Sequence, residues 1–150
     1  MIIHDVQTVI DSANNILNDT NLISITANAV ERLVSFGYIP TDEDAWMIAY
    51  IIKGTVNHVL NEINHQTVPN GLHEVVVDMV CGEVLNAKFL SGQLDMTALD
   101  LNGMIQSVKE GDIQVNFSAE GSDEAKAQEL FRWLIHGKGC DLLCYRKMRW

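Results

Sequence analysis

The chain has 150 residues, of which 47% are hydrophobic and 20% charged, a composition typical of one globular domain and too apolar for a disordered chain. Residues 1–131 contain five Lys or Arg against nineteen Asp or Glu, a net charge of −14, whereas residues 132–150 carry a net charge of +4. An acidic body repels phosphate, which argues against nonspecific nucleic-acid binding. The basic end indicates either a docking segment for an acidic or polar protein surface or a solvated helix terminus whose cations favour the helix dipole.

The sequence predicts neither a secretion signal nor a membrane span. The first residues, MIIHDVQTVID, contain early acids and no basic segment, and no apolar run approaches the roughly 20 residues needed to cross a bilayer. Three cysteines, an odd number, occur at Cys81, Cys140 and Cys144. We therefore expect a cytosolic, reduced protein whose thiols are free.

Apolar residues at three- and four-residue steps predict two helices in the first third of the chain, over residues 3–18 and 23–36. Gly37 is a suitable C-terminal cap for the second of them. Pro40 and the sequence Thr41-Asp-Glu-Asp44 then mark a helix start, because Thr41 can cap free backbone N–H groups and the three acids lie at the positive end of the dipole.

The helix that follows should run from about 42 to 64, with a wide apolar face that begins at Trp46 and predicts burial on more than one side. After a short turn, a further helix is predicted over about 69–91, with Pro69 in its first turn. Its Val75–Val77 run would also suit a strand, but length and spacing favour a helix. Gly82 costs roughly 1 kcal/mol against Ala in a helix, and a close helix–helix approach would explain it.

Residues 91–103 indicate a loop or a broken helix, and residues 104–118 predict a β-hairpin. Ile113, Val115 and Phe117 alternate with polar residues, and Lys109-Glu-Gly-Asp112 would form the turn, with Gly111 supplying a positive φ. A two-stranded hairpin is marginal alone, so we expect it to rest on the helices or on a neighbouring subunit.

Ser122 can cap a final helix, which Gly137 and Gly139 should interrupt before a short helix over residues 141–145. The predicted fold is therefore mainly α: a helical bundle with one small β-hairpin and an extended C-terminal arm.

Few residues suggest catalysis or metal binding. His136, Cys140 and Cys144 are spaced by four residues, but the two glycines between them break the helix that would align them, and buried or half-buried thiols are favoured over a metal site. Capping accounts for the acids at 42–44, and His58 and His65, seven residues apart on the predicted long helix, are more typical of surface or core polar residues. No phosphate loop or hydrolase motif occurs in the sequence. We expect no catalytic residues, no cofactor, no metal and no enzyme.

The chain ends in Tyr145-Arg-Lys-Met-Arg-Trp150, which places aromatic residues among cations. Tyr, Trp and Arg are the residues that dominate interface hot spots. This end either folds back onto its own bundle or anchors in another subunit, and docking is favoured because chain ends order mainly when docked.

Seven segments follow one another along the chain: Phe36-Gly-Tyr38, Thr41–Asp44 with the long helix, Asn61-Glu-Ile-Asn64, Val68-Pro-Asn-Gly-Leu72, Asp78–Glu83, Ser107-Val-Lys-Glu-Gly-Asp112 and Tyr145–Trp150. Read together, they resemble the head–tail connector (adaptor) proteins of tailed phages and prophages of Gram-positive bacteria. The resemblance covers roughly residues 22–150, and residues 1–21 are less characteristic. The Gly137–Gly139 break departs from the uninterrupted last helix of that family.

The resemblance implies a single domain, with a bundle and hairpin over 22–136 and a docking arm over 137–150. Subunits of this family assemble, typically as twelve, into a ring between the portal protein and the next neck or tail-completion protein, inside the virion. The resemblance implies portal contact for Tyr145, Arg146, Lys147, Met148, Arg149 and Trp150. It also places Lys109, Glu110, Gly111 and Asp112 at a subunit boundary or in the lumen, where DNA would pass without specific binding.

Two other functions remain open. One is another neck or tail-completion ring protein, and the other is a small helical regulatory protein that binds a partner. A helix-turn-helix DNA reader is disfavoured, because none of the internal helices is basic.

Overall fold

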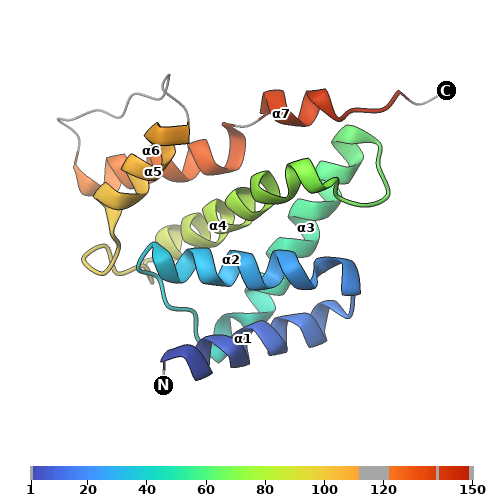
Figure 1. Cartoon of the computed structure of the whole chain (residues 1–150). Coiled ribbons are helices and arrows are strands. Elements are labelled where there is room, and N and C mark those ends of the chain that lie inside the picture. The colour runs from blue at the N-terminus through green and yellow to red at the C-terminus, as the bar shows by residue number, and fades with distance from the viewer. Residues whose placement is uncertain (1, 112–121, 138, 149–150) are drawn as a thin grey trace.

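The computed structural model describes residues 2–111, 122–137 and 139–148, which form a helical bundle (Figure 1). The helices are α1 (Ile2–Leu17), α2 (Ile23–Ser35), α3 (Ala45–Ile63), α4 (His73–Leu90), α5 (Leu101–Gly111), α6 (Asp123–His136) and α7 (Gly139–Cys144). Single 3₁₀ turns precede α2, α3 and α4, at Thr20–Leu22, Asp42–Asp44 and Asn70–Leu72. The mainly helical fold predicted from the sequence is confirmed, and so is the interruption between α6 and α7.

Helix α4 lies in the middle of the bundle, with α2 and α6 on opposite sides of it (Figure 1) and α3 packed against it as well. Burial is nearly continuous along α4 and includes Val75, Val76, Val77, Asp78, Met79, Val80, Cys81, Gly82, Val84 and Leu85. A helix that is apolar on all sides belongs in a core rather than on a surface. The β-branched Val75–Val77 run, which also suited a strand, is therefore explained by a helix with a neighbour on each side.

At Gly82, α4 and α6 approach each other closely. A Cβ atom added at Gly82 would lie 2.8 Å from the Leu134 Cβ and 3.2 Å from the Phe131 carbonyl oxygen. Phe131 and Leu134 are both buried, and the Phe131 ring meets the Phe89 ring edge to face with centroids 6.2 Å apart. The close helix–helix approach predicted from the mid-helix glycine is confirmed.

The predicted β-hairpin over 104–118 is not supported, since residues 104–111 belong to α5 and the described part of the chain contains no strand. Leu101, Met104 and Ile105 already have helical spacing, and Met104 is fully buried with the other two packed partly against the core. Helical burial therefore overrides the strand pattern on this side of the turn. The alternating residues Ile113, Val115 and Phe117 lie outside the described residues.

Gly37 ends α2 with a φ of +97°, as the sequence predicts. The amide of Gly37 donates to the Val34 carbonyl at 3.0 Å, and the amide of Tyr38 donates to the Leu33 carbonyl at 3.0 Å, which is the pattern of a glycine-terminated helix. The chain then turns along the loop after α4, where the Asp100 amide donates to the Phe36 carbonyl at 3.0 Å.

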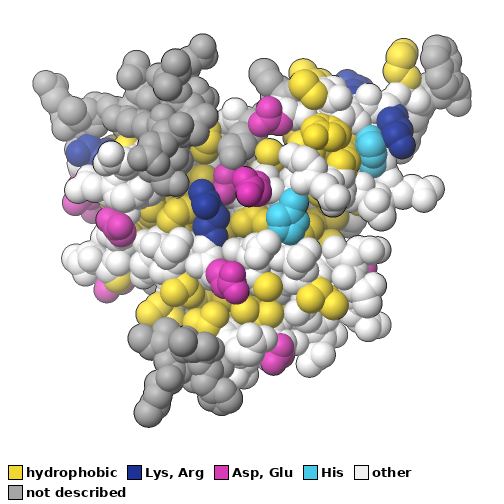
Figure 2. All heavy atoms as spheres, viewed as in Figure 1, with side chains coloured by type: hydrophobic (Ala, Val, Ile, Leu, Met, Phe, Trp, Pro, Cys, Tyr) yellow, Lys and Arg dark blue, Asp and Glu magenta, His cyan; other side chains and the backbone are white. Residues whose placement is uncertain are grey.

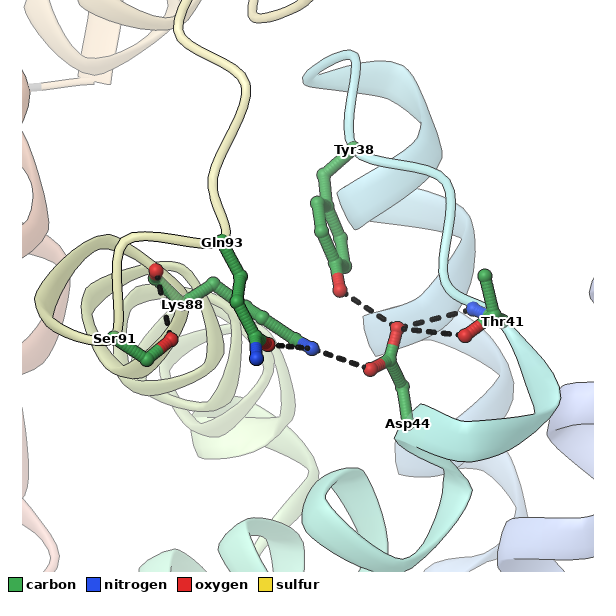
Figure 3. A network of polar contacts seen from close by, with 6 residues as sticks. All are labelled: Tyr38, Thr41, Asp44, Lys88, Ser91 and Gln93. Atoms are coloured by element: carbon green, nitrogen blue, oxygen red, sulfur yellow. Dashed lines mark hydrogen bonds and ion pairs between the residues drawn. The ribbon is translucent and has the colours of Figure 1, made fainter.

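The predicted helix start at Thr41–Asp44 is present, but Asp44 has a larger part in it than dipole compensation. Its carboxylate accepts from the Thr41 amide at 3.0 Å, and it forms an ion pair with Lys88 of α4 at 2.6 Å (Figure 3). The Tyr38 hydroxyl donates to the same carboxylate at 2.7 Å, and Lys88 also donates to Gln93 at 3.0 Å. Asp44 therefore joins the start of α3 to the end of α4.

Two opposing effects set the pKa of Asp44. Burial raises it, but hydrogen bonds from Lys88, Tyr38 and Thr41 together outweigh burial and lower the pKa below its ordinary value of 3.8. Burial and the nearby carboxylate raise the pKa of Tyr38, so this phenol stays protonated and keeps donating. Asp44, Lys88, Tyr38 and Thr41 therefore form a network of charge-assisted hydrogen bonds rather than an isolated surface ion pair.

A second ion pair joins α2 to α4. The Arg32 Nε lies 2.7 Å from the Asp78 carboxylate, whose side chain is 8% exposed. The Arg32 guanidinium also lies 4.9 Å from the centre of the Phe36 ring, a cation–π arrangement. Among the residues whose burial the structure describes, the two buried carboxylates, Asp44 and Asp78, are thus each neutralised by a cation from another helix, as burial of a charge requires.

Cys81 and Cys144 are free thiols, the first buried and the second exposed. The expectation of free thiols is confirmed for these two, whereas the expectation that Cys144 is buried or half-buried is wrong. None of the described helices combines the length and apolar character that crossing a membrane requires.

Replacing Gly82 with Ala should destabilise the bundle, because the new methyl group forces α4 and α6 apart; we expect a loss of about 1–3 kcal/mol in the free energy of unfolding. Gly54→Ala is the matched control, since a Cβ atom at this mid-helix position of α3 meets nothing within 4 Å. It should stabilise by up to about 1 kcal/mol. Urea unfolding of both variants measures the difference, and equal effects would contradict the close contact at Gly82.

Replacing Asp44 with Asn should lower the free energy of unfolding at neutral pH by about 3 kcal/mol, because Lys88 loses its charged partner. Since the folded-state pKa of Asp44 is depressed, its contribution is present above the unfolded-state value near 3.8 and is lost as the pH falls through the folded-state value. The wild type should therefore lose more stability than Asp44→Asn between about pH 5 and pH 2. Asp42→Asn, at an exposed neighbour, serves as control and should change the free energy of unfolding at neutral pH by less than about 1 kcal/mol.

Candidate functional site

The candidate site is the C-terminal arm, defined here as residues 145–148, together with the corner of the bundle where it lies. Helix α7 packs on α3, with Leu142 partly buried against the core, and leads the chain toward the turn that joins α3 to α4 (Figure 1). The arm leaves α7 after Cys144 without further regular structure. Over residues 145–148 the chain is neither helix nor strand, whereas α7 occupies much of the predicted 137–150 arm.

Three hydrogen bonds join the arm to the C-terminal end of α3. The Lys147 amide donates to the Ile63 carbonyl at 2.8 Å, and the Asn64 side-chain amide donates to the Lys147 carbonyl at 2.6 Å. The His65 Nε2 lies 2.6 Å from the Tyr145 carbonyl, and because a carbonyl only accepts, His65 must carry its proton on Nε2. On the arm's side, all three bonds use main-chain atoms.

The end of α3 is shaped for this contact. Asn64 adopts the left-handed conformation with a φ of +58°, which asparagine tolerates better than most residues, and it stops the helix after Ile63. His65 therefore lies beyond the helix, and its predicted place on the long helix is wrong. The Tyr145 ring lies against Gly71, where a Cβ atom would overlap the phenol.

The Tyr145 ring lies against Gly71, whereas the other three side chains of the arm are exposed. Arg146 and Lys147 are exposed, and Met148 is 75% exposed. Basic, histidine and hydrophobic side chains gather on the end of the molecule where α7 and the C-terminus lie (Figure 2). The arm thus lies against its own bundle through its backbone and the Tyr145 ring, as one of the two predicted alternatives has it, while the Arg146, Lys147 and Met148 side chains are exposed. Docking in another subunit stays a prediction.

A groove runs between α3, α4, α6 and α7, beside the arm. Its larger part has a volume of about 360 Å³ and its smaller part about 200 Å³. Both parts are lined by His58, Met79, Ile135 and His136. Acidic side chains stand at its two parts, Glu83 in the larger and Glu62 in the smaller. The groove can take an apolar side chain next to a cation.

The outer face of α3 carries two large aromatic side chains, one helical turn apart. Trp46 is 71% exposed and Tyr50 is 81% exposed, so the prediction that the apolar face starting at Trp46 is buried is wrong at this residue. Tyr50 and Gly54 also line the larger part of the groove. Single hydrophobic residues scattered over a surface are normal. Two neighbouring exposed aromatic residues at the edge of the groove mark a candidate contact face.

Other predicted candidates lie elsewhere. Lys109, Glu110 and Gly111 belong to the end of α5 rather than to a hairpin turn, and Asp112 lies outside the described residues, as do Arg149 and Trp150. Over the described residues, no three His, Cys, Asp or Glu side chains are grouped so that they could hold a metal ion.

Sequence reasoning did not identify Asn64, His65 and Gly71 as the platform of the arm. Asn64 and Lys147 are 83 residues apart, and no local pattern links them. The available signal was weak: Asn64 and, five residues later, Pro69 mark a helix end, and Gly71 leaves room above the backbone.

In comparisons with known proteins, no family model, curated protein or solved structure matches the chain. The assignment of a function therefore rests on the residues of the arm and of the surfaces around it.

Proposed function

We propose that the chain is a non-enzymatic structural subunit of a phage or prophage head–tail connector, which assembles into a ring between the portal protein and the next neck or tail-completion protein of the virion. The observation that carries the proposal is the arm, a basic chain end whose backbone is bonded to the bundle and whose Arg146, Lys147 and Met148 side chains are exposed. The resemblance of segments over residues 22–150 gives the partner as the portal, and twelve copies as the expected ring size.

Charge supports the assignment of the arm to an acidic or polar docking surface. Five of the ten Lys and Arg residues of the chain lie in residues 132–150, and Arg146 and Lys147 are exposed. Complementary charge speeds encounter and fixes the register of a contact, while an anchoring aromatic or methionine side chain supplies most of its affinity. Met148, at 75% exposure, is such an anchor.

The outer face of α3 supports the assignment of a ring. Ring closure requires two different complementary patches on each subunit. Trp46 and Tyr50 provide one apolar patch, on a helix other than the one that leads into the arm. We assign this patch to the contact with the neighbouring copy.

The acidic body supports a conduit for DNA. Residues 1–131 carry a net charge of −14, which repels phosphate and would let DNA pass without being held. The competing function is a regulatory protein that binds a partner through the groove; such a protein would stay monomeric and ignore the portal.

Reversing two charges of the arm, Arg146→Glu with Lys147→Glu, should weaken portal binding at least tenfold, because each substitution replaces attraction by repulsion. The fold should be retained, since the arm's hydrogen bonds to the bundle use backbone atoms. Lys53→Glu with Lys126→Glu changes the net charge equally outside the arm and should bind as the wild type does. Sedimentation with purified portal protein measures binding, and unchanged binding of the arm variant would remove the docking role.

Replacing Trp46 and Tyr50 with Ala should leave the monomer's unfolding free energy within about 0.5 kcal/mol, because both side chains are exposed. Ring formation should weaken more than tenfold, as truncation of anchoring aromatics at interfaces does. Ile23→Ala, at a residue 47% exposed on α2, is the control. Mass photometry with portal present reads the ring size, and full rings from the double variant would contradict this interface.

A further inference from the structure

The arm is hydrogen-bonded through its backbone to the α3–α4 corner, defined here as Ile63, Asn64, His65 and Gly71. Every bond from the corner reaches a main-chain atom of the arm, at the Tyr145 carbonyl, the Lys147 amide and the Lys147 carbonyl. The side chains of Arg146 and Lys147 take no part in these bonds and are exposed. A partner can therefore contact the arm's side chains without first breaking its backbone bonds.

The corner also gains from the contact. The last carbonyls of an α-helix have no partner within the helix, and the Ile63 carbonyl at the end of α3 receives the Lys147 amide. Asn64 stops α3 in a left-handed conformation, and the His65 amide closes the helix end onto the Leu60 carbonyl at 3.3 Å. Gly71 completes the corner by leaving room for the Tyr145 ring.

We propose that Asn64, His65 and Gly71 are positioning residues that hold the arm, before any partner binds, in the conformation in which it docks. That this conformation is the one that docks rests on the proposed function, whereas the claim that the three residues hold the arm concerns the free subunit alone. A chain end that is already ordered loses less conformational entropy on binding than a free one. The corner therefore increases affinity without touching the partner.

Amide hydrogen exchange of the free wild-type protein, followed by NMR, tests whether the corner holds the arm. The Lys147 amide should exchange at least tenfold more slowly than in an unstructured chain, because it is bonded to the Ile63 carbonyl. Exchange of Lys147 at the unstructured rate would overturn the inference, whatever the portal does.

Asn64→Gly tests the role of the corner, because Gly keeps the left-handed backbone and removes only the side-chain amide. Gly71→Ala removes the space for Tyr145. Both variants should speed exchange at Lys147 and weaken portal binding roughly three- to tenfold, the effect of one or two hydrogen bonds. Asn57→Ala, at an exposed asparagine of α3 away from the corner, should change neither.

The two readouts separate the possible failures. Tighter portal binding by Asn64→Gly would mean that the corner restrains the arm instead of presenting it, and would overturn the inference. A wild type with a protected Lys147 amide that does not bind portal would refute the proposed function and leave the holding role of the corner established.

Discussion

Helix α4 is apolar on all sides, so other helices must cover each of them, and the rest of the bundle is arranged around that constraint. Ten of its residues are buried, and two of them set conditions that apolar packing alone does not meet. Gly82 requires α6 to lie almost against the α4 backbone, and Asp78 requires a cation, which Arg32 of α2 supplies. Near the C-terminal end of α4, the cation is Lys88 of α4 itself, and Asp44 at the start of α3 supplies the carboxylate. The two ion pairs therefore fix how α2 and the start of α3 lie against the central helix.

Because α4 takes the inner faces of α2, α3 and α6, what remains for function is on the outside. The outer face of α3 carries Trp46 and Tyr50, and its C-terminal end carries the arm. One helix thus supports two surfaces of the proposed ring subunit, a patch for the neighbouring copy and a platform for the chain end that we propose binds the portal. The acidic body and the basic end keep these roles electrostatically distinct.

The sequence predicts the elements whose signals are local. The helices around Gly37, Thr41 and Gly82 follow from capping and from spacing of apolar residues. The hairpin prediction fails because Met104 and Ile105 fit a strand as well as a helix over so short a stretch, and only contact with the core decides. The pairing of Asp44 with Lys88 and the contact of His65 with Tyr145 join distant segments, so no pattern of spacing could reveal them. The exposure of Trp46 likewise depends on where the other helices pack, which spacing along α3 does not show. The chemical character of the arm was evident in the sequence, but its platform was not.

The central claim is that the C-terminal arm, held by its own bundle through backbone bonds, presents its side chains to a partner. An electron cryomicroscopy map of the subunit assembled on portal protein tests it most directly. The account predicts a closed ring in which the Arg146 and Met148 side chains contact the portal while the Lys147 amide remains bonded to the Ile63 carbonyl. A ring in which the arm touches only its own subunit would contradict the account.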